Sequence, residues 1–190
     1  MSDVFISYRR ADAGWAGRLL ECLEECFDVF FDTEDIDSGD LFPERIESAL
    51  AACRVCCVAI GPEWGRPKQL RRLVDARDWV RHEIVSVLGR PRVRVIPLLG
   101  GAALPDEAAL PEPLRPLLQR NAFILSHDKW KSDYDEVIRR MEAWLSTQAP
   151  EGAARGEPPP VLPFLCDRVP AYQAARNTPF PAEDSRCPTA

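Results

Sequence analysis

The 190-residue sequence lacks several motifs that would place it directly in a functional class. It contains no GxGxxG dinucleotide fingerprint, no phosphate-binding P-loop and no GxSxG nucleophile elbow. Basic residues are also outnumbered, with 24 Lys and Arg against 30 Asp and Glu, which gives a net charge of −6. This balance argues against a surface that binds nucleic acid directly or docks on an anionic membrane.

Long apolar runs are missing as well. The best candidate, residues 95–104, is about half as long as a membrane-spanning helix and contains Pro and Gly. The first residues, MSDVFISY, show no charged segment followed by an apolar one, so no signal peptide is expected. The sequence therefore predicts a cytoplasmic protein without membrane contact.

Histidine is scarce, with two residues, and the seven cysteines do not form the paired CxxC motifs of a zinc site. Cys22 and Cys26 are spaced as on a helix, whereas Cys53, Cys56 and Cys57 surround the start of an apolar run. Free buried cysteines behave as small hydrophobic side chains. We therefore favour free thiols over a metal site or a disulfide framework.

A regular alternation of strand-like and helix-like segments extends to residue 147. Short apolar runs predict strands at 3–8, 28–32, 54–61, 92–100 and 121–126. Helical patterns predict helices at 14–26, at 43–53, in a segment ending at Gly89 and at 133–145, where one stripe holds Val137, Ile138, Met141, Trp144 and Leu145. This order predicts an α/β fold, a five-stranded parallel sheet with helices on both faces.

The character of the chain changes after residue 147. Residues 148–190 contain nine of the eighteen prolines and little amphipathic pattern. We predict one domain at 1–147, followed by a Pro-rich tail that is mostly disordered or begins a further module.

Ligands of doubly wound sheets bind beyond the carboxyl ends of the strands. The segments expected there are SYRR, DTEDIDSGD, GPEW and GGAA. The third predicted strand ends in AIGPEW, without the acidic residue that a phospho-accepting receiver domain would need. That class is therefore excluded.

The segment RDWVRHEI, residues 77–84, predicts a helix with Trp79 and Glu83 on one face. The 100° rule places both at the boundary of the buried face, half sheltered, with His82 directed away from the core. A half-buried carboxylate beside an indole can hold sugar hydroxyls and stabilise an oxocarbenium-like centre. The alternative is plain boundary packing, with Glu83 paired to Arg77 or another neighbour. The predicted buried stripe is Val80, Ile84, Val87 and Leu88.

Three segments together resemble the Toll/interleukin-1 receptor (TIR) domain family: DVFISYRR, VFFDTEDIDSGDLF and RDWVRHEI. They occur in the right order, and the resemblance covers residues 3 to about 147. The sequence is particularly similar to NAD-consuming TIR domains, including those of bacterial defence proteins. The resemblance implies a flavodoxin-like fold and cleavage of NAD+ at the nicotinamide–ribose bond, with NAD+ as the substrate and no cofactor.

The resemblance also implies roles for individual positions. It makes Glu83 the catalytic glutamate and places at the substrate pocket Trp79, Tyr8, Arg9, Arg10, Asp32 and Asp37. An arginine at the end of the first strand could contact the pyrophosphate, although adjacent arginines are also common on solvated surfaces. In this family the loop after the second strand mediates TIR–TIR contacts, which implies self-association.

The function expected from these observations is that of an NAD+ nucleosidase. Its products would be nicotinamide and either ADP-ribose or a cyclic ADP-ribose. We expect a bacterial anti-phage effector that assembly activates, with an upstream sensor protein as a possible partner. Two alternatives stay open: a non-enzymatic TIR signalling module, and a different base–sugar hydrolase such as a nucleoside deoxyribosyltransferase.

Overall fold

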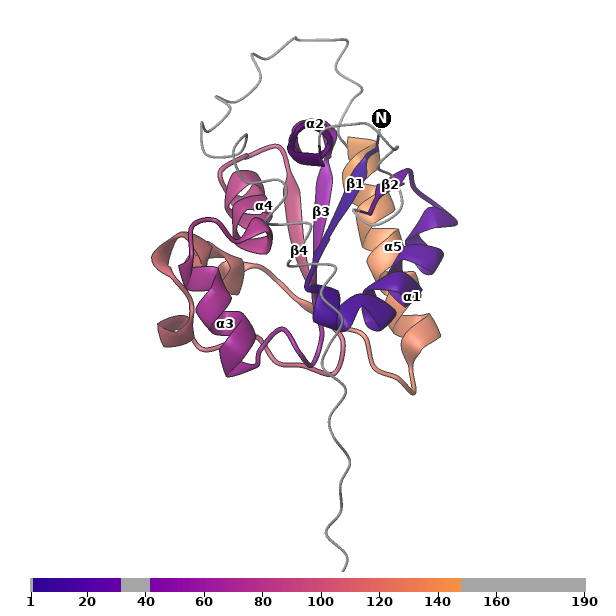
Figure 1. The fold of residues 1–190 in the computed structure, drawn as a ribbon. Coiled ribbons are helices and arrows are strands. Elements are labelled where there is room, and N and C mark those ends of the chain that lie inside the picture. The colour runs from indigo at the N-terminus through magenta and orange to yellow at the C-terminus, as the bar shows by residue number, and fades with distance from the viewer. Residues whose placement is uncertain (1, 32–41, 148–190) are drawn as a thin grey trace, which may run out of the picture. The chain divides into compact units, whose positions relative to one another are not determined.

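A computed structural model describes residues 2–31 and 42–147 of the chain (Figure 1). Asp32 and Asp37, most of the predicted loop at 33–42 and the Pro-rich tail at 148–190 lie outside the described residues. The predicted domain boundary at residue 147 stays a prediction.

The central element is a parallel sheet of five strands in the order β2-β1-β3-β4-β5. Both predicted features, the strand number and the parallel arrangement, are confirmed. The two edge strands are shorter than the sequence predicted, because only two residues of each pair with a neighbour. The strands are β1 (Val4–Tyr8), β2 (Val29–Phe30), β3 (Val55–Ile60), β4 (Arg94–Leu99) and β5 (Phe123–Ile124).

Helices cover both faces of the sheet (Figure 1). Helices α1 (Ala13–Glu24) and α5 (Trp130–Thr147) lie together on one face, where their apolar side chains form one core with the strands. Helix α4 (Trp79–Leu88) lies on the opposite face beside α2 (Phe42–Ala52). The remaining helical elements are α3 (Pro67–Val74), η1 (Arg10–Asp12), η2 (Glu107–Ala109) and η3 (Glu112–Gln119).

The apolar stripe predicted for the last helix is confirmed. Val137, Ile138 and Met141 are buried, and Trp144 and Leu145 pack against the same core from its margin. No helix within the described ranges is long and apolar enough to cross a bilayer.

Strand β1 is buried along its whole length, as expected for a central strand covered on both faces. Its side chains alternate between the two faces. Val4, Ile6 and Tyr8 belong to the core beneath α1 and α5, so Phe5 and Ser7 point toward the face that carries α4. This alternation places a polar side chain, Ser7, beneath α4.

The helix predicted across RDWVRHEI begins later than the sequence suggested. Residue Asp78 is the N-cap of α4, and its side chain accepts a hydrogen bond from the backbone N–H of Arg81 at 3.0 Å. The preceding residues form the separate helix α3, which the sequence pattern did not predict. The C-cap at Gly89 is confirmed.

Candidate functional site

The strand order places a topological switch point between β1 and β3. From β1 the chain continues to β2 on one side, whereas β3, β4 and β5 follow on the other. The carboxyl end of β1 holds Ser7 and Tyr8, with Arg9 directly after it, and lies beside α4. Helix α4, which carries Trp79 and Glu83, is therefore adjacent to the position where ligands bind in such sheets.

Glu83 lies in the interior between α4 and β1. It is 2 % exposed, and its Oε2 accepts a hydrogen bond from the Ser7 hydroxyl at 2.7 Å. The predicted half-sheltered boundary position is therefore wrong, because β1 offers a polar partner that a helical wheel does not contain. The predicted alternative partner, Arg77, instead forms a surface ion pair with Asp75.

Trp79 is also buried rather than at a half-exposed boundary, with 8 % of its surface accessible. Its ring meets the edge of the His82 ring at a centroid distance of 5.7 Å. His82 does not point away from the protein as predicted, because its Nε2 bonds to Glu47 on α2. Leu88, expected in the buried stripe, is only half-buried. The neighbouring α2 thus shelters a side of α4 that the sequence pattern marked as exposed.

Arg9 extends β1 and forms a buried ion pair. Its Nη1 lies 2.7 Å from Asp78 Oδ2, and both side chains are 3 % exposed. The partly exposed Arg72 also approaches the same carboxylate oxygen, at 3.4 Å. Because Asp78 is the N-cap of α4, this pair fixes the start of that helix to the end of β1. The structure thus shows a positioning contact for Arg9; its predicted pyrophosphate contact stays a prediction.

The other predicted pocket residues do not all gather around Glu83. Tyr8 is buried on the opposite face of the sheet, where its ring stacks on Phe31 with a centroid distance of 4.5 Å. Arg10 is exposed at the start of η1. Both residues lie at the carboxyl edge of the sheet, but the strand itself separates the Tyr8 side chain from Glu83.

A further buried carboxylate, Asp12, was not predicted from the sequence. Its Oδ1 accepts a hydrogen bond from the backbone N–H of Glu63 at 3.0 Å, which ties the start of α1 to the loop after β3. A Cβ at Gly61 would approach this carboxyl group within 2.4 Å, so only glycine fits there. Burial raises the pKa of Asp12, and the backbone hydrogen bonds from Glu63 and Trp64 only partly offset that rise.

We expect the free energy of unfolding of Asp12→Asn to increase, relative to that of the wild-type chain, as the pH rises from 3 to 7. Because its pKa is raised, Asp12 stays protonated to a higher pH in the folded chain than in the unfolded chain, where it ionises above pH ~4. Ionisation of Asp12 therefore favours the unfolded wild-type chain as the pH rises. Asparagine keeps an acceptor for the Glu63 N–H but carries no charge. Urea unfolding of both proteins across this pH range measures the difference. A difference that is independent of pH contradicts the assignment.

The buried cysteines carry no sign of reactive thiols. Burial raises the pKa of Cys57 to about 12 and that of Cys53 to about 11. The pKa of Cys56 is raised well above its ordinary value, first by burial and then by its ionisable neighbours Cys53, Cys57 and Glu83. These three thiols are therefore neutral, as small hydrophobic side chains would be. Cys22 is half-buried and Cys26 exposed. Within the part of the chain that the structure describes, no cluster of three metal-ligating side chains occurs.

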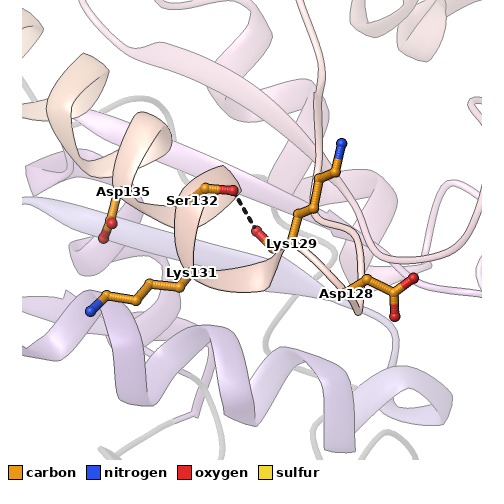
Figure 2. Close-up of a pocket in the computed structure, with 5 residues that line it drawn as sticks. All are labelled: Asp128, Lys129, Lys131, Ser132 and Asp135. Atoms are coloured by element: carbon orange, nitrogen blue, oxygen red, sulfur yellow. Dashed lines mark hydrogen bonds between the residues drawn. The ribbon is translucent and has the colours of Figure 1, made fainter.

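A shallow depression at the start of α5 is unrelated to this site (Figure 2). The side chains of Lys129 and Lys131 point in different directions, and Ser132 donates a hydrogen bond to the Lys129 carbonyl at 3.0 Å. The lining side chains are all exposed and of mixed charge, and none is a predicted site residue: Asp128, Lys129, Lys131, Ser132 and Asp135. This arrangement does not direct polar groups toward a common ligand.

The comparison with protein families decides the assignment that the fold and motifs suggested. A model of the TIR domain matches residues 4–141. The chain belongs to the TIR domain family. The resemblance inferred from the three sequence segments is thus confirmed, and the matched region contains β1, α4 and the Ser7–Glu83 contact.

Relatives of known name include two NAD(+) hydrolases. The chain is 28% identical over 153 residues to NAD(+) hydrolase SARM1 of Danio rerio, which covers 80% of this chain and 21% of that protein. It is also 28% identical over 150 residues to NAD(+) hydrolase sarm1 of Drosophila melanogaster, covering 75% of this chain and 10% of that protein. The chain therefore spans only 21% of the first of these relatives and 10% of the second.

The fold itself matches solved TIR domains. The TIR domains of the activated Roq1 resistosome superpose with a TM-score of 0.54 at 16% identity, covering 76% of this chain and 99% of that chain. At this identity the match supports the fold alone, and it agrees with the predicted flavodoxin-like arrangement.

Proposed function

We propose that this TIR domain is an NAD+ glycohydrolase that cleaves the bond between nicotinamide and ribose. The observation that carries the proposal is Glu83, a carboxylate held in the interior beside Trp79 and next to the switch point of the sheet. The two relatives named as NAD(+) hydrolases support the same reaction.

The chemistry requires a negative charge near the ribose. When the glycosidic bond of NAD+ breaks, positive charge moves from the nicotinamide ring to the ribose, which becomes oxocarbenium-like. A fixed carboxylate stabilises that charge most strongly where water is excluded. The nicotinamide leaves as a neutral molecule, so its departure needs no proton from the protein. Glu83 has the position and chemical type for this role.

Other residues have proposed roles around this centre. Trp79 offers an indole on which an aromatic ring of NAD+ can stack once the ring is uncovered. Arg10 is exposed at the same edge of the sheet and can reach a phosphate. Tyr8 and Arg9 lie at the end of β1, next to this site. The acidic residues of the predicted substrate set, Asp32 and Asp37, remain part of the proposal.

The burial of Trp79 and Glu83 bears on how activity would be controlled. Both side chains are 8 % exposed or less, so NAD+ binding requires that this part of the fold opens. We propose that TIR–TIR contact promotes the opening, in keeping with an immune effector that assembly activates. Sedimentation of the purified protein over a range of concentrations, with and without NAD+, tests for this self-association.

The direct test is cleavage of NAD+ by the purified chain. We expect release of nicotinamide together with ADP-ribose or a cyclic ADP-ribose, separated by chromatography and identified by mass. A fluorescent NAD+ analogue gives the rate, and nucleosides serve as control substrates. Release of free base from nucleosides but not from NAD+ would favour the base–sugar hydrolase alternative. No cleavage of either, at any protein concentration, would leave a TIR interaction module as the function.

A further inference from the structure

Ser7 is a polar residue in a strand where every other side chain is apolar or aromatic. All five residues of β1, VFISY, are buried, and Ser7 is 0 % exposed. It pairs in the sheet with Val58 of β3, so it sits at the centre of the fold rather than at a margin. A buried hydroxyl without a partner is costly, and native proteins nearly always supply one. The partner here is Glu83, 76 residues away in the sequence.

The geometry of this contact is that of a strong hydrogen bond. The distance from Ser7 Oγ to Glu83 Oε2 is 2.7 Å, as is typical when a hydroxyl donates to a carboxylate. Both groups are almost completely excluded from water, which strengthens the electrostatic part of the bond. Loss of the Ser7 hydroxyl would therefore remove one donor that stabilises the charged form of Glu83.

A second contact from β1 holds the same helix. Arg9, two residues after Ser7, binds Asp78, which is five residues before Glu83. Two residues of a strand span about 6.6 Å, and five residues of a helix span about 7.5 Å. The two bonds therefore match in spacing, and they hold α4 antiparallel to β1 and fixed in register. Ser7 binds the Glu83 carboxylate directly, whereas Arg9 binds Asp78 at the start of the helix.

We propose that Ser7 is the positioning residue that holds the Glu83 carboxylate in a single orientation for cleavage of the glycosidic bond. This inference rests on the proposed NAD+ glycohydrolase function. A carboxylate that must stabilise a developing charge is most effective when it does not have to reorient during the reaction. Ser7 supplies this restraint from a rigid central strand.

Several ionisable groups on α4 and on the neighbouring β3 are neutral or have partners of their own. The neighbouring Cys56 thiol on β3 is neutral, because burial raises its pKa well above the ordinary value. On α4, Asp78 is paired with Arg9, and His82 is paired with Glu47 of α2. Substitution of Ser7 therefore changes the surroundings of the carboxylate without removing another charge.

The first test compares Ser7→Ala with Ser7→Thr, which restores a hydroxyl on the same strand. We expect Ser7→Ala to fold and to lower kcat about tenfold, since hydrogen bonds to charged groups have effects of that size, with little change in KM. The acid limb of its pH–rate profile should move to higher pH, because the ionised carboxylate loses a donor. Ser7→Thr should recover most of both effects. Ser132→Ala, which removes an exposed hydroxyl from α5, is the matched control and should change neither quantity.

Two outcomes overturn the inference. One is a wild-type kcat and an unmoved acid limb in Ser7→Ala. The other is a loss of activity that follows a lowered melting temperature and is not restored by threonine, which would mean a packing role alone.

A second measurement does not depend on catalysis: the NMR titration of the Glu83 side-chain carboxyl carbon in the wild-type and Ser7→Ala proteins. A higher midpoint in Ser7→Ala supports the restraint even if the wild-type chain cleaves no NAD+, and an unchanged midpoint refutes it.

Discussion

Replacing Glu83 by Gln is expected to lower the rate of NAD+ cleavage by about a hundredfold or more while leaving the fold intact. A buried group that stabilises transition-state charge has an effect of that size. Glutamine has the same shape and keeps an oxygen that can accept the Ser7 hydrogen bond, so the change removes the negative charge and little else. The measurement is the initial rate of nicotinamide release, together with the melting temperature of each protein.

The matched control is Glu142→Gln, the same substitution at an exposed position of α5. It should retain wild-type activity. If Glu83→Gln cleaves NAD+ as fast as the wild-type chain, with an unchanged melting temperature, then Glu83 is not the catalytic group. A large loss of stability in Glu83→Gln would instead show that the buried carboxylate has mainly a structural role.

Much of the fold could be predicted from the sequence because its signals are local or periodic. The buried parallel strands are continuous apolar runs, as in VCCVAI of β3, and α5 carries its apolar stripe at helical spacing. The signal fails where the pairing is short. Strand β2 contains only Val29 and Phe30, whereas the apolar pattern predicted a strand at 28–32. The length of an edge strand depends on how many residues pair with its neighbour, and the apolar pattern does not show this.

The candidate site was harder to predict because it depends on contacts across the fold. A helical wheel places Glu83 relative to its own helix, but its burial depends on Ser7 of β1 and cannot be seen in residues 77–84. One signal was available: Ser7 and Arg9 are polar residues spaced two apart at the end of an apolar strand, so they share a face. That spacing predicts a common partner element, although it cannot identify α4.

The separate helix α3 shows the same limit. Residues 67–74 hold the charged sequence PKQLRRLV, in which only Leu73 is buried. This helix spans only eight residues and buries one apolar side chain, so its pattern is shorter than the window in which a helical period can be recognised. The break before α4 is set by Asp78, whose carboxylate both caps the next helix and binds Arg9. The ion partner, and hence the reason for an acidic residue there, becomes visible only in three dimensions.

Removing the positive charge of Arg9 is expected to cause the largest loss of stability among single substitutions in this region. Arg9→Met keeps much of the side-chain volume but leaves Asp78 buried without its ion partner. Breaking such a pair typically costs about 3–5 kcal/mol. We expect about 3 kcal/mol here, the lower end of that range, because the partly exposed Arg72 also lies near Asp78 and offsets part of the loss. Urea unfolding monitored by tryptophan fluorescence gives the change.

The coupling between the two residues is tested by adding Asp78→Asn, which removes the charge and keeps a good N-cap for α4. The double variant should be more stable than Arg9→Met alone, since no unpaired charge then stays buried. Arg77→Met is the control, because its ion pair with Asp75 is at the surface, and its unfolding midpoint should match the wild-type value. Additive losses from Arg9→Met and Asp78→Asn would show that the pair does not hold α4 to β1. A stable Arg9→Met protein with lost NAD+ cleavage would instead favour the pyrophosphate contact predicted for Arg9.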